Sequence, residues 1–153
     1  MRPPPLDLAA RRPLWIALSE FWLDTEMSAS TAHYVVRILL DAPYSLDEAE
    51  AIHWREVAPV LYHNLYPFSV AGEWGAFPED WLVAACERQS RARWPAPLVA
   101  MRTRALRSFA SDLPDVVFER ARRAQREGLP PRPTGPFQSL VASRDPVRYR
   151  VPW

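Results

Sequence analysis

Two histidines and a glutamate are the residues whose types and spacing could support catalysis or metal binding. His53 and Glu56 are three positions apart, so on a helix they share a face and could hold a metal ion or activate a water molecule. His63 could supply a third ligand. The spacing matches neither HExxH nor the paired ExxH of di-iron bundles. A structural histidine beside Trp54 is the more common outcome, so we expect no catalytic residues, no metal site and no cofactor.

The sequence contains a single cysteine, Cys86, and four glycines. One cysteine cannot form an intramolecular disulfide and leaves no CxxC motif for a metal or for redox chemistry. Cys86 falls in an apolar stripe without a basic activator on the same turn, so we interpret it as a small buried hydrophobe. The glycines form no GxGxxG or phosphate-binding loop. These features do not support nucleotide binding, and they favour a reducing, cytoplasmic location.

The charged residues are divided unequally along the chain. All 19 basic residues are arginines, which a GC-rich coding sequence explains without reference to function. Residues 1–87 carry 5 arginines and 13 acids, whereas residues 88–153 carry 14 arginines and 5 acids. The formal net charge of +1 therefore conceals a dipolar sequence. Such asymmetry indicates a charged partner, or a basic segment folded on an acidic body.

The arginine-rich half allows two interpretations of equal weight. It could bind the phosphates of a nucleic acid, or it could be a solvated face partly paired with the acids of the same chain. No recognition helix or RNA-binding motif accompanies the arginines. We keep nucleic-acid binding as the alternative function, with candidate residues Arg102, Arg104, Arg107, Arg120, Arg123 and Arg126.

The acidic half contains a cluster of carboxylates between two expected helices. Such a patch could steer toward the basic cleft of a nuclease or other toxin and block it. Tryptophans would act as anchors in such an interface, because Trp and Arg dominate binding hot spots. The candidate partner-binding residues are Asp47, Glu48, Glu50, Trp54, Glu73 and Trp74.

A helix positions most of these candidates. Ser45 and Glu48 form a capping-box pattern, which predicts a helix start. Pro59 must kink or end this helix, because it lacks an N–H and crowds the preceding turn. A tight loop anchored by Trp74 then leads to Pro78, the expected start of the next helix. The predicted buried face comprises Leu46, Ala49, Ile52, His53, Val57 and Val60.

The remaining sequence predicts an all-α fold, a compact bundle of five or six helices with a Pro-rich extended C-terminal arm. The first helix should begin near Pro13 and the last should end at Gly128. A helix over residues 97–110 should turn Leu98, Met101, Ala105 and Phe109 inward.

Three regions follow from the distribution of proline. Residues 1–10 are expected to be a flexible leader, residues 11–128 a single helical domain, and residues 129–153, with six prolines, an extended arm. The amino terminus has neither the apolar core of a signal peptide nor the length of a membrane span, so we expect no membrane partner.

Several short segments together resemble a family of small bacterial proteins. That family is a domain of unknown function, of the kind associated with immunity proteins paired with secreted toxins. The resemblance covers Arg11 to Trp94 and implies no catalytic residues. It rests on Arg11–Trp15, Ala17–Glu26, Pro43–Leu46, Glu56–Leu61, Asn64–Leu65 and Ala71–Trp74 followed by Phe77. The leading hypothesis is therefore a non-enzymatic immunity protein that binds and occludes a cognate toxin.

Overall fold

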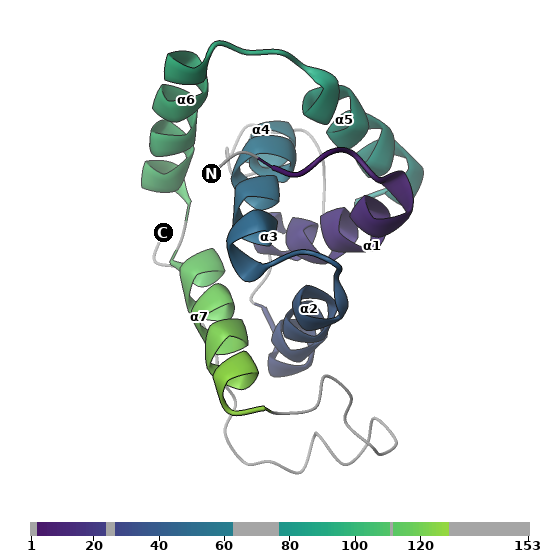
Figure 1. Cartoon of the computed structure of the whole chain (residues 1–153), viewed down its shortest axis with the longest axis vertical. Helices are drawn as coiled ribbons and strands as arrows, with labels where there is room; N and C mark the ends of the chain where they lie inside the picture. The colour runs from purple at the N-terminus through teal and green to yellow at the C-terminus, as the bar shows by residue number, and fades with distance from the viewer. Residues whose placement is uncertain (1–2, 24–26, 63–76, 111, 129–153) are drawn as a thin grey trace.

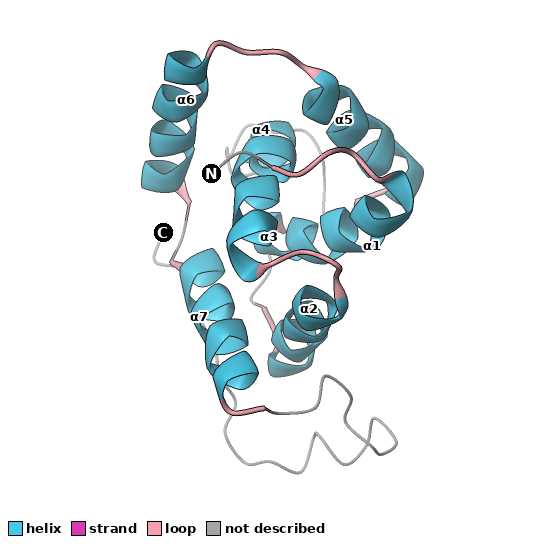
Figure 2. Cartoon of the chain, in the orientation of Figure 1, coloured by secondary structure: helices cyan, strands magenta, loops and turns pink. Residues whose placement is uncertain are grey.

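Helices form the regular structure of the computed structural model, which describes residues 3–23, 27–62, 77–110 and 112–128 (Figure 1). No strand occurs within these ranges, so the predicted all-α class is confirmed (Figure 2). In chain order the elements are α1 (Leu8–Ser19), the 3-10 turn η1 (Glu20–Trp22), α2 (Ala29–Asp41), α3 (Leu46–Ile52), the π turn η2 (His53–Val57), α4 (Ala58–Leu61), α5 (Glu79–Arg91), α6 (Ala96–Phe109) and α7 (Leu113–Arg126).

Helix α1 begins at Leu8, earlier than the predicted start near Pro13. The side chain of Asp7 accepts hydrogen bonds from the backbone N–H groups of Ala9 and Ala10, at 3.0 and 3.3 Å. This N-cap satisfies donors that the first turn leaves unpaired, so the helix starts five residues before the proline. Pro13 is accommodated inside the helix.

Helix α3 begins as the capping box predicts. The hydroxyl of Ser45 accepts from the backbone N–H of Glu48 at 3.2 Å, and the carboxylate of Glu48 accepts from the backbone N–H of Ser45 at 2.9 Å. Five of the six residues predicted to face inward, Leu46, Ala49, Ile52, His53 and Val57, are buried. The sixth, Val60, is partly buried against the core.

The helix does not end at Pro59 but widens before it. In the π turn η2 the backbone N–H of Ala58 bonds the carbonyl of His53, five residues back. Pro59 has no N–H to offer the carbonyl of Arg55, and that carbonyl accepts a hydrogen bond from Nε2 of Gln89 on α5 at 3.1 Å. The predicted kink is therefore a π turn whose freed carbonyl is bonded by a neighbouring helix.

The continuous segment α3–η2–α4 lies in the middle of the molecule (Figure 1). The π turn contacts α1, α5 and α6, while α2 packs on α7 and α1 packs on α5. Large side chains fill the core where these helices meet, and Trp15, Trp22, Phe118, Leu39 and Ile52 are each 0–1% exposed.

Helix α6 buries few of its side chains against the other helices. Among the α6 residues whose side chains are described, Leu106 alone is buried. The sequence predicts that Leu98, Met101, Ala105 and Phe109 face inward. For three of them the prediction is wrong: Leu98 is 43% exposed, Met101 is 65% exposed and Ala105 is exposed. The side chain of Phe109 lies outside the described part of the structure. Apolar periodicity identifies residues that share a helix face, but it does not identify what covers that face.

Other predictions concern the ends of the described ranges. Gly128 follows α7 with a φ of +62°, the left-handed C-cap expected there. Three predicted features lie outside the described residues: the C-terminal arm at 129–153, the loop around Trp74, and the side chain of His63. None of the described helices combines the length and apolar character of a membrane span.

Candidate functional site

His53 lies in an aromatic cage in the core. Its ring packs at centroid distances of 5.2 Å from Phe21, 5.9 Å from Trp22, 4.7 Å from Trp54 and 6.3 Å from Phe118. The side chain is 0% exposed, and neither ring nitrogen has a hydrogen-bond partner among the described residues. Burial, and secondarily the positive charge of Arg107, lowers the pKa of His53 to about 3. The imidazole is therefore neutral at physiological pH and acts as a packing group.

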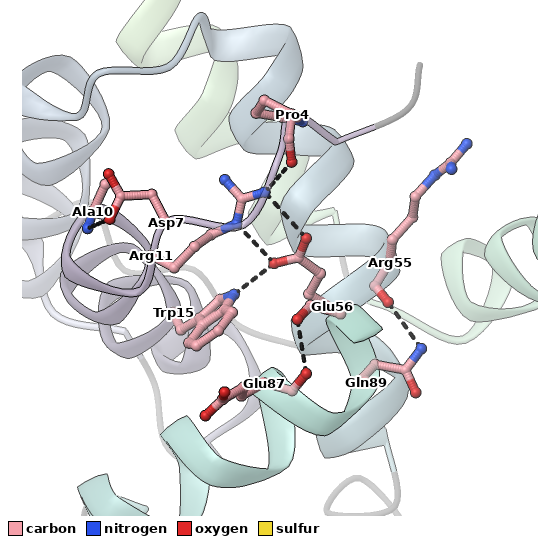
Figure 3. A network of polar contacts seen from close by, with 10 residues as sticks. Pro4, Asp7, Ala10, Arg11, Trp15, Arg55, Glu56, Glu87 and Gln89 are labelled. Carbon is pink, nitrogen blue, oxygen red and sulfur yellow. Dashed lines mark hydrogen bonds and ion pairs between the residues drawn. The ribbon is translucent and has the colours of Figure 1, made fainter. Parts of the chain in front are cut away.

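Glu56 lies in a separate polar network that joins α1 to the π turn (Figure 3). Its Oε2 accepts hydrogen bonds from Nε of Arg11 at 3.0 Å and from Nε1 of Trp15 at 2.8 Å. The other end of the guanidinium donates to the carbonyl of Pro4 at 2.8 Å. Arg11 is 0% exposed and its Cζ lies 4.7 Å from the ring centroid of Tyr44. Three segments that carry the family resemblance, those containing Arg11, Tyr44 and Glu56, therefore meet in one buried network.

The surroundings of Glu56 favour a structural role. Burial raises the pKa of Glu56, while the charge of Arg11 and the hydrogen bond from Trp15 oppose that shift. His53 and Glu56 contact different residues, so the two groups considered from their spacing do not share a site. Cys86 is also buried, and burial together with the nearby charge of Glu56 raises the pKa of its thiol to about 12. The described residues contain no group of three or more His, Cys, Asp or Glu side chains placed to hold a metal ion.

A surface cleft of about 540 Å³ lies between the α3–η2 segment and α6. It brings together residues from both interfaces that the sequence suggests. Asp47, Glu50 and Trp54 of the acidic set face Arg104 and Arg107 of the arginine set across it. The other described residues that line it are Ala51, Arg55, Val99, Ala100 and Thr103.

The carboxylates of the predicted acidic patch already have partners within the chain. Glu50 accepts from Arg107 on α6 and, at 2.7 Å, from Arg122 on α7. Arg122 also contacts Asp47 at 3.2 Å. Glu48 is used in the capping box. The acidic and basic halves of the sequence are therefore ion-paired with each other, as one of the two interpretations of the charge pattern expects.

The predicted arginine face is engaged in a similar way. Arg123 pairs with Glu127 at 2.7 Å and Arg126 with Glu119 at 2.9 Å. Arg120 donates to Nε2 of His33. Arg107 pairs with Glu50 as described above. Of the six candidate arginines, Arg102 and Arg104 therefore have no hydrogen-bond partner among the described residues. The guanidinium of Arg102 lies 5.4 Å from the ring centroid of Trp94.

Two lining arginines of the cleft, Arg55 and Arg104, have no carboxylate partner among the described residues. The side chain of Arg55 extends away from the helix and makes none of the contacts drawn in Figure 3, where only its carbonyl is bonded. The sequence did not predict that Arg55 belongs to a candidate binding site. A single arginine on an otherwise acidic helix forms no motif or charge cluster that would identify it. Trp54, which lines the cleft, is 4% exposed and lies 4.8 Å below the guanidinium of Arg107, with its indole N–H unpartnered among the described residues.

A family model described as "Domain of unknown function (DUF7079)" matches residues 9–117. The matched range contains Arg11, Trp15, Tyr44 and Glu56 of the buried network, helix α6 and the described residues that line the cleft. Neither a curated protein nor a solved structure matches the chain.

Proposed function

The chain belongs to the DUF7079 family, a domain of unknown function, and from that premise we propose that it is a non-enzymatic bacterial interaction protein. Specifically, we propose an immunity protein that binds a cognate toxin in the cytoplasm and occludes the toxin's active surface. The partner contacts α6 and the cleft behind it.

The observation that carries this proposal is the apolar side of α6 that no described element covers. Leu98 is 43% exposed and Met101 is 65% exposed, and Ala105 continues the same stripe at helical spacing. Trp94, just before the helix, is 52% exposed. A contiguous apolar surface bordered by arginines is typical of protein interfaces, in which aromatic residues, Met and Arg are enriched. Binding of a toxin here would remove this surface from water.

A protein partner explains these features better than a nucleic acid. Phosphate binding requires guanidinium groups that are free to replace counterions. Of the six arginines in the alternative set, Arg107, Arg123 and Arg126 are paired with carboxylates and Arg120 is bonded to His33. The exposed apolar side chains have no role in backbone recognition of a duplex.

The test is affinity capture of the tagged protein from its own cells, with and without nuclease, followed by mass spectrometry. We expect one stoichiometric protein that survives nuclease. Expressed alone, the captured partner should stop growth of the cells. Co-expression of the immunity protein should restore growth. The variant Leu98→Asp with Met101→Asp should lose both capture and protection, because it places two charges in the apolar stripe.

Leu8→Asp is the matched control, because Leu8 is a similarly exposed apolar residue (42%) at the start of α1. It should capture the partner as the wild type does. Recovery of ribosomal and nucleoid proteins that disappear with nuclease would favour the arginine alternative instead. A captured protein without toxicity would contradict the immunity role.

A further inference from the structure

The cleft between α3–η2 and α6 has an excess of positive charge at its walls. Its described lining includes three arginines, Arg55, Arg104 and Arg107, and two carboxylates, Asp47 and Glu50. Arg122 on α7 does not line the cleft but pairs with both carboxylates. Both carboxylates are bonded to Arg107 or Arg122, so the guanidiniums left to bind something else are those of Arg55 and Arg104. The cleft is therefore electrostatically complementary to an acidic group, although its α3 wall appears acidic in the sequence.

We propose that this cleft binds an acidic segment of the partner protein, with carboxylates of that segment bonded to Arg55 and Arg104. The inference rests on the proposed function and names the chemistry of the partner. It reverses the polarity expected from the sequence, in which an acidic patch of this chain blocks a basic cleft of the toxin.

The shape and lining of the cleft suit side chains of a peptide. Its volume of about 540 Å³ accommodates a few residues. Val99 and Ala100 supply apolar surface and Thr103 a hydroxyl from the α6 wall. Arginine's planar fork bonds a carboxylate in a bidentate manner, which is stronger and more directional than a contact with an ammonium group.

The same lining disfavours a nucleic-acid strand. Single-stranded nucleic acids bind to exposed aromatic rings on which bases stack. Trp54 is the one aromatic residue among the described residues that line the cleft. It is 4% exposed and lies under the guanidinium of Arg107, so it offers no stacking platform. Asp47, with a side chain 65% exposed at the rim, also repels a continuous chain of phosphates.

The test uses the full chain and two probes, an acetylated hexaglutamate peptide and an oligothymidylate of the same formal charge. Binding is followed in low salt by the 15N-labelled indole N–H signal of Trp54. We expect hexaglutamate to shift this signal saturably. Arg55→Ala with Arg104→Ala should weaken binding by at least about tenfold, the effect of losing a charge-assisted hydrogen bond.

Arg88→Ala is the control, because Arg88 is exposed on α5, outside the cleft, and has no ion pair among the described residues. It should bind hexaglutamate as the wild type does, and circular dichroism should show that all variants are folded. The proposal is overturned by an unshifted Trp54 signal, by equal binding to the double variant, or by tighter binding of oligothymidylate at the same residues.

The capture experiment separates this inference from the proposed function. If the wild type and the Arg55→Ala, Arg104→Ala variant capture the toxin equally, the immunity function stands and the acidic-segment inference fails. If no toxin is captured while hexaglutamate binds the cleft saturably, the immunity function fails and the chemistry assigned to the cleft stands.

Discussion

Arg11 and Glu56 form an ion pair from which water is excluded. Nε of Arg11 lies 3.0 Å from Oε2 of Glu56, and the two side chains are 1% and 4% exposed. The pair joins the first helix to the π turn across 45 positions of sequence. Trp15 and the carbonyl of Pro4 add hydrogen bonds to it, whereas Nη1 of Arg11 is buried without a partner among the described residues. A buried pair of this kind specifies which helices come together, because either charge alone would be costly in the core.

Removing one member of this pair should therefore be severe. Arg11→Ala leaves the charge of Glu56 buried without its cation, and we expect a loss of about 3–5 kcal/mol in the free energy of unfolding. The double replacement Arg11→Met with Glu56→Leu should be more stable than Arg11→Ala, because it leaves no buried charge. Urea unfolding followed by tryptophan fluorescence measures both.

The neighbouring residue provides the control. Arg12 pairs with Glu79 at 2.7 Å, but both side chains are about half exposed (51% and 52%). Arg12→Ala should hardly change the urea midpoint, because solvent screens exposed pairs. Similar losses in the free energy of unfolding for Arg11→Ala and Arg12→Ala would show that the buried pair contributes no more to stability than the exposed pair.

Local signals allowed the sequence to predict much of the fold. The capping box at Ser45 and Glu48 and the C-cap at Gly128 each depend on a few adjacent residues, and both are confirmed. The start of α1 was predicted near Pro13, because proline suits the first turn of a helix. The helix begins earlier because Asp7 caps it.

The cleft was not predictable, because it depends on which distant charges pair. Arg107 and Arg122 reach Glu50 across 57 and 72 positions, and no spacing rule selects Glu50 from the 18 acids of the chain. The exposure of Leu98 and Met101 is also a tertiary property. The spacing of the apolar residues places Leu98 and Met101 on one face of the helix. Whether another helix packs on that face cannot be predicted from this spacing, and among the described helices none covers it.

The neutral His53 should make folding stability depend on pH. The pKa falls from 6.5 to about 3 on folding, so between these values the unfolded chain binds a proton that the folded chain excludes. The free energy of unfolding is therefore greatest above about pH 6.5 and decreases as the pH falls toward 3, by roughly 1.4 kcal/mol for each pH unit. His53→Leu, which keeps an apolar side chain in the aromatic cage, should flatten this dependence in urea titrations at several pH values.

Two other groups must be separated from His53 in that measurement. Burial raises the pKa of Glu56, which contributes with the opposite sign, because the folded state then binds its proton more tightly than the unfolded state. His33 has a pKa lowered by burial and by Arg120, but it is less enclosed. His33→Gln should therefore retain most of the pH dependence, and an unchanged slope in His53→Leu would contradict the assignment.

The hydrogen bond from Gln89 to the carbonyl of Arg55 should matter because Pro59 follows it. Gln89→Ala leaves a partly buried carbonyl without this donor, and we expect a loss of about 1 kcal/mol in the free energy of unfolding. Pro59→Ala restores a backbone N–H that can bond the same carbonyl. In that background Gln89→Ala should cost less, and a double-mutant cycle in urea measures the difference. Equal costs in both backgrounds would show that the proline does not create the need for Gln89.

The thiol of Cys86 should be inert in the folded protein. Cys86 is 0% exposed, and burial, followed by the charge of Glu56, raises its pKa from 9.0 to about 12. This shift alone lowers the thiolate fraction at pH 8 by roughly a thousandfold, and the thiolate is the species that reacts with disulfide reagents. We therefore expect labelling by 5,5′-dithiobis(2-nitrobenzoate) to be at least roughly a thousandfold slower in buffer than in denaturing urea. Rapid labelling of the folded protein would show that α5 opens readily, which would contradict the burial of Cys86 in the core.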